Sequence, residues 1–411
     1  MYSKTITGFG AVGDGVTKCT KAIQSAIDDC AAHGGGEVII GDGSFVTGTI
    51  FLKSGVHLVI RPTARLLAGL DPEDYPDFDP CFDKTFAPRR TARCLIYAEN
   101  CENIGISGGG VIDCRGENFC EYTPYDRFYR RKTDRLPARM IFFYQCRDAI
   151  IENISVLEMA GGWAFWINGC DRVRFSRLTV RCNPLYPNSD GVHINCSRDV
   201  FLSDSILDCG DDCVILRANT KTLPEKRPCE RIAVTNCTLS SNSCAIRIGW
   251  TNDGVIRNSV FSNLSITDSW YGISIEFPKK SPEPFTDQGD DSTVVRNLTF
   301  DNIVMDNLET SPIRLLSYPY NKVDSISGII FRGITATSKE LPVFRAEKGV
   351  KVSRIRLSDC DFRTLSESGT IEFTNISEVS MNNVLLGNLS RGVPGNKQCK
   401  RVIHAAAANI Q

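Results

Sequence analysis

Three aspartates in the stretch NSDGVHINCSRDVFLSDSILDCGDDCVIL, residues 188–216, have the type and spacing for acid–base chemistry. Asp190 precedes one short apolar run, and the adjacent pair Asp211 and Asp212 precedes the next. Carboxylates crowded on one patch differ in proton affinity, so one can act as an acid and another as a base. Hydrolysis of a glycosidic bond needs such a pair. The alternative is that all three are turn residues, since aspartate is common at strand ends.

Repeated short strands are the elements that would position these aspartates. Nine segments have an apolar third residue and, except at Arg345, an apolar fifth residue, which is typical of strands with one buried face. The segments are MIFFYQ from Met140, WAFWIN from Trp163, DGVHIN from Asp190, DCVILR from Asp212, CAIRIG from Cys244, YGISIE from Tyr271, SPIRLL from Ser311, LPVFRA from Leu341 and GTIEFT from Gly369. Their starts are 22 to 40 residues apart, with further short strands between them. This pattern predicts an all-β, single-stranded right-handed parallel β-helix.

The predicted solenoid extends over the whole chain, 1–411, as a single domain. We assign 1–60 to an N-terminal cap and the first coils, 61–139 to early coils with long loops, 140–390 to regular coils carrying the active-site face, and 391–411 to a C-terminal tail or cap. Because a solenoid end exposes an open core, it needs a cap. The segment TKCTKAIQSAIDDCAAHGGG has a helical apolar stripe and stops at Gly34, so it predicts a capping helix.

Composition and charge narrow the possible partners. The 47 basic and 48 acidic residues give a net charge of -1, with no overall attraction for nucleic acid or an anionic membrane. No apolar run reaches the roughly 20 residues of a membrane helix. The opening MYSKTITGFGAVGDG has no signal-peptide core, so we expect a cytoplasmic protein if the chain is native, and a periplasmic or secreted one if a signal was trimmed. Oligomeric state is not encoded in these patterns.

The 18 cysteines are spread over a large domain that does not need disulfides, so we expect buried, reduced thiols. There is no C-x-x-C motif, and there are four histidines. We therefore predict no metal and no cofactor.

The strand register predicts where the candidate side chains point. First, fourth and sixth positions project outward, so Asp190 and Asp212 share one column on neighbouring coils, about 5 Å apart in backbone. Asp211 immediately precedes the second of them. His193 falls in the fourth column, where it hydrogen-bonds substrate or an aspartate, or merely fills a groove.

At these residues the chain resembles the polygalacturonase family, glycoside hydrolase family 28. The resemblance rests on FGAVGDG, LIYAENCENIGISGGGVIDCRG, the N-x-D motif at Asn188–Asp190 and the G-D-D motif at Gly210–Asp212. It implies that Asp211 is the general acid, that Asp190 and Asp212 hold the attacking water, and that the anomeric carbon is inverted. Asn188 would belong to the substrate-binding site. The carboxyl groups of an inverting pair are roughly 6.5 to 9.5 Å apart.

Two family motifs are altered in this sequence. The histidine of G-H-G is replaced by Cys244, and R-I-K, which grips the galacturonate carboxylate, reads Ser274, Ile275 and Glu276. In one interpretation Arg247 and Arg314, which flank Ser274, replace that grip together with nearby Arg217. In another the sugar is neutral and Glu276 accepts hydrogen bonds from its hydroxyls. In a third, Arg217 and Glu276 form only a surface ion-pair network.

Aromatic residues and two long loops complete the predicted face. Side chains placed outward or beside the aspartates are Trp163, Trp166, Phe143, Trp250, Trp270 and Tyr271. Such rings stack on sugars or are covered by loops. The loops are residues 71–90 and 120–139, and the second holds Arg127, Arg130, Arg131, Lys132, Arg135 and Arg139. This charge run is a solvated surface, or it selects acidic chains or closes one end of the cleft.

The sequence thus predicts an inverting glycoside hydrolase of a pectin-related or other plant-type glycan, with carbohydrate as its partner. Three alternatives stay open: a hydrolase of a neutral or non-galacturonate glycan, a pectate-lyase-like enzyme with calcium and an arginine base, and an inactive carbohydrate-binding β-helix. The sugar, the linkage and endo or exo action are not encoded in these motifs.

Overall fold

The computed structural model describes residues 2–124, 126, 128–133, 135–278, 289–319, 321–365, 370–388 and 399–401. The chain divides into two compact units. Unit 1 consists of Met1–Asp211 and Thr222–Pro224, and unit 2 consists of Asp212–Lys221 and Glu225–Gln411. The boundary falls between the two adjacent aspartates. In the described part of the chain, no helix is both long and apolar enough to span a bilayer.

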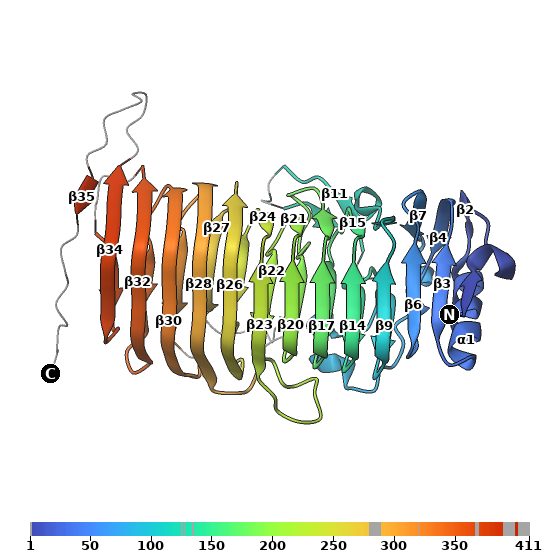
Figure 1. Ribbon diagram of the computed structural model, residues 1–411, viewed down its shortest axis with the longest axis horizontal. Helices are drawn as coiled ribbons and strands as arrows, with labels where there is room; N and C mark the ends of the chain where they lie inside the picture. The colour runs from blue at the N-terminus through green and yellow to red at the C-terminus, as the bar shows by residue number, and fades with distance from the viewer. Residues whose placement is uncertain are drawn as a thin grey trace. The chain divides into compact units, whose positions relative to one another are not determined.

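Unit 1 is built from parallel strands stacked coil on coil. One sheet runs β5 (Ile50–Phe51), β8 (Cys94–Glu99), β13 (Arg139–Tyr144), β16 (Trp163–Asn168) and β19 (Val192–Asn195). A second runs β1 (Ser3–Thr5), β3 (Gly36–Ile40), β6 (Val56–Ile60), β9 (Glu102–Ser107), β14 (Arg147–Glu152), β17 (Asp171–Ser176) and β20 (Arg198–Ser203). A third runs β2 (Asp14–Lys18), β4 (Gly43–Thr47), β7 (Ala64–Ala68), β10 (Val111–Asp113), β15 (Ser155–Leu157), β18 (Thr179–Arg181) and β21 (Ile206–Cys209). Figure 1 shows β9, β14, β17 and β20 side by side and pointing the same way.

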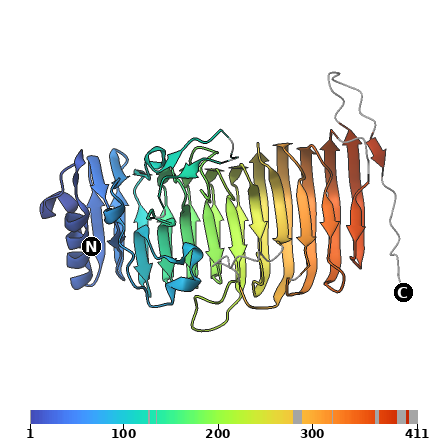
Figure 2. The same ribbon diagram turned by 180° about the vertical axis from the view of Figure 1, so that it is seen from behind.

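The helix that the sequence predicts near the N-terminus is α1 (Thr20–Ala32). Its buried stripe is Ile23, Ala26, Ile27 and Cys30, and it contacts β1, β3, β5 and β6 of unit 1. Gln24 exchanges hydrogen bonds with the backbone of Phe51, so the helix is tied to β5, the strand that pairs with β8. Figure 2 shows this helix beside the first coils of unit 1.

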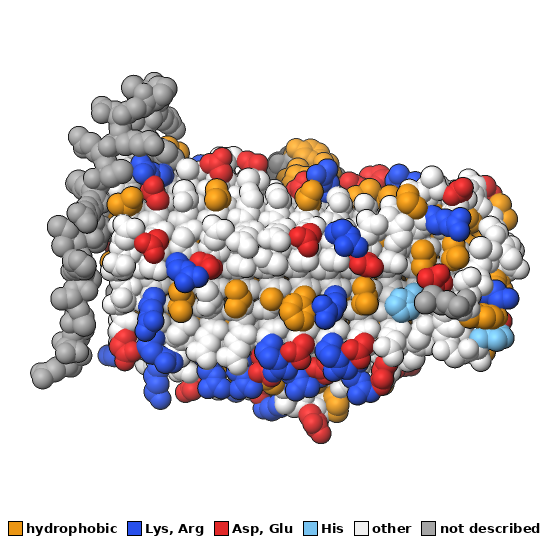
Figure 3. Space-filling model, in the orientation of Figure 1, with side chains coloured by type: hydrophobic (Ala, Val, Ile, Leu, Met, Phe, Trp, Pro, Cys, Tyr) orange, Lys and Arg blue, Asp and Glu red, His pale blue; other side chains and the backbone are white. Residues whose placement is uncertain are grey.

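Short elements connect the coils of unit 1. They are η1 (Ile6–Phe9), η2 (Pro72–Asp74), η3 (Lys84–Phe86), η4 (Pro88–Arg90), η5 (Gly116–Asn118) and the antiparallel pair β11 (Cys120–Glu121) and β12 (Arg130–Arg131). Ion pairs follow one edge of β14, β17 and β20, where Figure 3 shows blue and red side chains gathered; Arg172 with Asp148 is exposed and Arg198 with Asp171 is half-buried. Such exposed pairs contribute little to stability.

Unit 2 repeats the same construction. One parallel sheet runs β22 (Val214–Arg217), β25 (Cys244–Ile248), β27 (Tyr271–Phe277), β29 (Ile313–Ser317), β31 (Val343–Arg345) and β33 (Glu372–Thr374). The remaining strands are β23 (Cys229–Thr235), β24 (Thr238–Ser241), β26 (Val255–Thr267), β28 (Thr293–Leu308), β30 (Val323–Ser338), β32 (Lys351–Thr364), β34 (Val379–Asn388) and β35 (Cys399–Arg401). Phe261, Phe300 and Phe331 stack inside successive coils at 4.9 and 5.2 Å. The predicted all-β parallel solenoid is confirmed.

Two of the nine predicted strand segments are shifted by one residue. In β13, Ile141 and Phe143 pair with the inward Phe165 and Ile167, so Phe142 and Tyr144 point outward and Phe143 does not. In β31, Phe344 pairs with Leu315, which puts Arg345 in an outward, exposed position. The apparent exception at Arg345 therefore came from the wrong register, and the period-2 pattern of that strand holds.

Candidate active site

Asp190 lies two residues before β19 in unit 1, next to the start of β16. The backbone oxygen of Asp190 accepts a hydrogen bond from the N–H of Ala164 at 2.8 Å. His193 is in the predicted outward column, with Nδ1 3.9 Å from Oδ2 of Asp190. Its ring stacks on Trp163 with centroids 3.8 Å apart. Both Asp190 and His193 are buried. The position of the His193 ring is therefore set by its stacking on Trp163 as well as by the Asp190 carboxylate.

The N-S-D segment packs directly against the G-D-D segment within unit 1. The N–H of Asp211 donates to the carbonyl of Ser189 at 3.4 Å, and the N–H of Gly210 donates to Cys182 Sγ at 3.3 Å. A Cβ atom at Gly210 would collide with Ser189 Oγ and lie 2.7 Å from the carbonyl oxygen of Tyr186. Glycine at this position therefore allows the close approach that brings the segments of Asp190 and Asp211 together.

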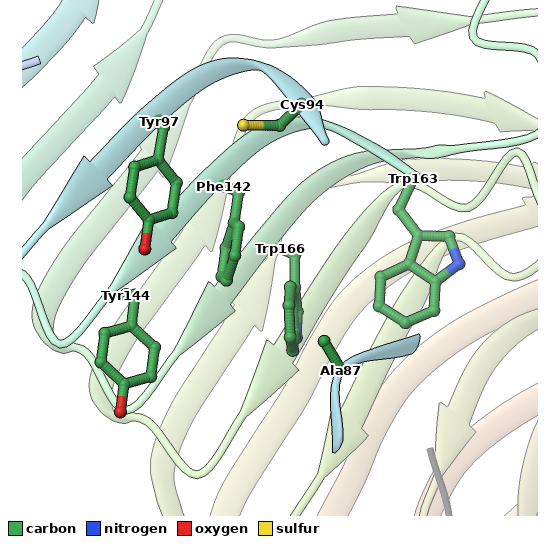
Figure 4. Packing of buried hydrophobic residues seen from close by; sticks show 7 residues of the cluster. All are labelled: Ala87, Cys94, Tyr97, Phe142, Tyr144, Trp163 and Trp166. Carbon is green, nitrogen blue, oxygen red and sulfur yellow. The ribbon is translucent and has the colours of Figure 1, made fainter. Parts of the chain in front are cut away.

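Outward aromatic residues of unit 1 form a covered cluster. Its buried members are Ala87, Cys94, Tyr97, Phe142, Tyr144, Trp163 and Trp166, and Figure 4 shows the rings of Phe142 and Trp166 face to face. These two rings stack at 4.2 Å. Phe78 and Phe82 from the first long loop pack over the cluster. Trp163 and Trp166 are buried in this cluster, so they offer no broad surface for sugar stacking.

Asp212 opens unit 2 and has both carboxylate oxygens engaged. Oδ1 accepts from the N–H of Cys244 at 2.9 Å, and Oδ2 accepts from Arg247 Nε at 2.6 Å. Arg247 also donates through Nη2 to Cys244 Sγ at 3.3 Å. These contacts fix the orientation of the Asp212 carboxylate.

Glu276 lies between two arginines in unit 2. The register places Arg247, Ser274 and Arg314 next to one another on adjacent strands, as the sequence predicts. Glu276 Oε2 accepts from the Ser274 hydroxyl at 3.1 Å and lies 3.7 Å from Arg247 Nη1. Its Oε1 accepts from Arg314 Nη2 at 3.5 Å and from the Tyr318 hydroxyl at 3.3 Å. Burial raises the pKa of Tyr318, and the Glu276 carboxylate raises it further, so the phenol stays protonated as a donor.

Arg217 has a different partner from the one the sequence suggests. Its guanidinium forms a two-point ion pair with Asp253, Nε to Oδ2 at 2.7 Å and Nη2 to Oδ1 at 3.0 Å. The two side chains are 4% and 0% exposed. The interpretation in which Arg217 and Glu276 form a surface ion pair does not hold, because Arg217 pairs with Asp253 in the interior and Glu276 lies between Arg247 and Arg314. The pair with Asp253 ties the end of β22 to the turn that carries Trp250.

Cys244, which stands where the family motif has histidine, is fully buried. Burial raises the pKa of its thiol, with the Arg247 charge acting in the opposite direction. Ser274 is also buried, while Arg247, Glu276 and Arg314 keep partly exposed edges. Arg314 lies over the Tyr271 ring at 4.0 Å from its centroid. The exposed part of this surface is therefore made by Arg247, Glu276, Arg314 and the two aromatic residues Tyr271 and Trp250.

The described cysteines are buried as predicted, except for Cys81. Arg127, one of the basic residues of the second long loop, lies outside the described residues. In the ranges that the structure describes, no group of three or more His, Cys, Asp or Glu side chains is arranged to hold a metal ion.

A family model for glycosyl hydrolases family 28 matches residues 83–385. The chain belongs to this family. A polygalacturonase of Persea americana is 24% identical over 425 residues, covering 97% of this chain and 81% of that protein. A probable polygalacturonase of Vitis vinifera is 25% identical over 287 residues, and the match covers 67% of this chain but only 57% of the grape protein.

Solved structures share the fold of this chain. An exopolygalacturonase of Thermotoga maritima superposes with a TM-score of 0.73 at 21% identity, covering 96% of this chain and 92% of that one. An endo-xylogalacturonan hydrolase of Aspergillus tubingensis has a TM-score of 0.63 at 16% identity, covering 96% and 97% of the chains. At such identities these structures establish the right-handed parallel β-helix. The family match identifies a polygalacturonase-type glycoside hydrolase acting on O-glycosidic bonds.

Proposed function

We propose that this enzyme cleaves a pectin-related glycan by direct attack of water, with inversion of the anomeric carbon. Asp211 gives its proton to the leaving glycosidic oxygen as the bond to the anomeric carbon breaks. Asp190 and Asp212 orient the water and take its proton as the new carbon–oxygen bond forms. The observation that carries the proposal is the packing of the N-S-D segment against the G-D-D segment around Gly210.

The contacts of Asp212 support its role as a water-holding carboxylate. Because Cys244 N–H and Arg247 fix both oxygens in unit 2, the side chain cannot rotate freely during the reaction. Preorganised charge of this kind lowers the barrier without reorganisation at the moment of reaction.

The surface around Glu276 favours an uncharged sugar. Two arginines, Arg247 and Arg314, face two carboxylates, Asp212 and Glu276, so the four side chains have no net charge. A sugar carboxylate would meet Glu276 where the family motif has lysine. We therefore propose that the sugar bound here is neutral or carries an esterified carboxyl group, with Glu276 accepting hydrogen bonds from its hydroxyls.

Turnover tests this function directly. The protein is incubated with acidic, methyl-esterified and neutral plant oligosaccharides, and the released sugars are quantified. We expect wild type to hydrolyse at least one pectic substrate and Asp211→Asn to abolish turnover while still binding it. Asp204→Asn is the matched control, because Asp204 is exposed, lies on a turn with a left-handed backbone that asparagine also adopts, and should be silent.

Two outcomes would contradict the proposal. A product with a new double bond, detected by its near-ultraviolet absorbance, would indicate a lyase. Binding without turnover of any glycan by the wild type would indicate a carbohydrate-binding solenoid.

A further inference from the structure

Arg89 lies at the end of the first long loop of unit 1. Arg89 and its neighbour Arg90 both have left-handed backbones, with φ of 58° and 50°. The same conformation recurs at other turns of the described chain, for example at Arg115 and Arg172. The direction of the Arg89 side chain is therefore set by its own hydrogen bonds.

The guanidinium of Arg89 reaches the segment that carries Asp190. Nη2 donates to Asn188 Oδ1 at 2.7 Å, and Nη1 donates to the carbonyl of Gly161. Asn188 is two residues before Asp190, and Gly161 is two residues before Trp163, which stacks on His193. Arg89 is half-buried, so part of its side chain faces solvent at this edge of the site.

A second arginine, Arg139, lies beneath this loop. It is fully buried, donates to the carbonyls of Pro88 and Thr91 at 2.6 Å each, and stacks over Trp166 at 4.3 Å. No acidic side chain among the described residues lies within ion-pair distance of it. Burial lowers the pKa of Arg139 to about 9, and the nearby charge of Arg89 acts in the same direction. Asp77, the acidic residue that also influences Arg139, is engaged with Thr91, Ala92 and Lys84.

A third arginine approaches from the second long loop. Arg131 lies so close to Gly161 that a Cβ atom there would be 2.5 Å from its Nε. Three cations from separate parts of unit 1 thus gather around Gly161 and Trp163, next to the segment of Asp190. A desolvated cation such as Arg139 raises the positive potential at its neighbours, which favours an anion there.

We propose that Arg89 is a specificity-determining residue that binds the carboxylate of a sugar beside the Asp190 segment of unit 1, with Arg131 as a second cation. The guanidinium fork matches a carboxylate in two-point geometry. The inference rests on the proposed function and adds to it. The sugar that contacts Arg89 has a free carboxylate, whereas the sugar that contacts Glu276 is uncharged. Arg131 belongs to the basic loop 120–139, so the proposal gives that loop a part in binding an acidic sugar.

Arg89→Gln tests the proposal through substrate preference. Wild type and variant are compared on pectic oligosaccharides of equal length with free and with methyl-esterified carboxyl groups. Loss of a charge-assisted contact should lower kcat/KM for the acidic substrate by about 10- to 100-fold, with little change for the ester. Arg89→Lys should retain part of the preference. Arg90→Gln is the matched control, because Arg90 is exposed and shares the same backbone conformation.

A purely structural role would give a different result. If Arg89 only positions Asn188, the variant should lose activity on acid and ester equally, and the acid-to-ester ratio should stay at its wild-type value. That outcome would overturn the proposal. A thermal-unfolding measurement checks that Arg89→Gln is folded. Arg89→Lys, which keeps the charge, gives a second measurement of the acid-to-ester ratio.

Binding separates this inference from the proposed function. In the Asp211→Asn background, calorimetry with the same oligosaccharides needs no turnover. A preference for the acidic form that disappears with Arg89→Gln would support the site even if the wild type hydrolyses neither substrate. An acid-to-ester binding ratio that Arg89→Gln leaves at its value in the Asp211→Asn parent, or no binding of either substrate, would overturn it.

Discussion

Glu276→Gln should shift the substrate preference of the enzyme towards free uronic acids. Glu276 is 12% exposed and faces Arg314 at 3.5 Å and Arg247 at 3.7 Å. A sugar carboxylate about 5 Å from it would be repelled by about 3 kcal/mol at an effective dielectric constant of about 20. Screening by solvent and the arginines reduces this to about 1.5 kcal/mol, or roughly a tenfold change. Glutamine keeps the size and one acceptor oxygen, which can serve Arg314 and Tyr318, while its NH2 group can donate to the Ser274 hydroxyl and the negative charge is removed.

The assay is the ratio of kcat/KM for acidic and methyl-esterified pectic oligosaccharides of equal length. We expect Glu276→Gln to raise the acid-to-ester ratio about tenfold. Glu309→Gln is the matched control, because Glu309 forms an exposed ion pair with Lys339 in the same unit and should leave the ratio unchanged. An unchanged ratio in Glu276→Gln would refute the assignment of an uncharged sugar to this position.

Three further predictions concern the scaffold of the site. Asp253→Asn should destabilise the protein by about 3 to 5 kcal/mol in chemical unfolding, because it leaves buried Arg217 without its anion; a loss below about 1 kcal/mol would contradict the structural role of the pair. Gly210→Ala should lower the free energy of unfolding by about 1 to 3 kcal/mol and reduce turnover, because the added Cβ displaces the N-S-D segment. Gly41→Ala is the control and should change neither quantity, because the space around its Cβ position is open. Since burial raises the pKa of Cys244, its thiol should resist alkylation at pH 8 in the folded protein, and mass spectrometry showing its modification there would be inconsistent with its burial.

The predicted register holds in most strands, including β16, β19 and β22, in which every residue is buried. It failed in β13, where all six residues are buried and the run from Met140 to Tyr144 is apolar, so the sequence has no period-2 contrast there. In β31 the charged Arg345 was the available signal for the shift, because an inward arginine conflicts with an apolar core.

Within each unit, the predicted register gave the correct neighbours for the outward side chains of the site. Arg247, Ser274 and Arg314 are adjacent as predicted, and His193 lies beside Asp190. The partner of Arg217 could not be predicted, because Asp253 lies 36 residues away in a turn whose path the strand pattern does not determine. Arg89 was missed for the same reason: it is 99 residues from Asn188, and a loop carries it there.

The stereochemistry of hydrolysis tests the central claim most directly. Proton NMR recorded during the first minutes of reaction identifies the anomer of the newly formed reducing end before mutarotation. Attack of water activated by Asp190 and Asp212, with Asp211 as the acid, predicts the anomer opposite to that of the cleaved bond. First formation of the same anomer would show retention through a covalent intermediate and would contradict the three-aspartate mechanism.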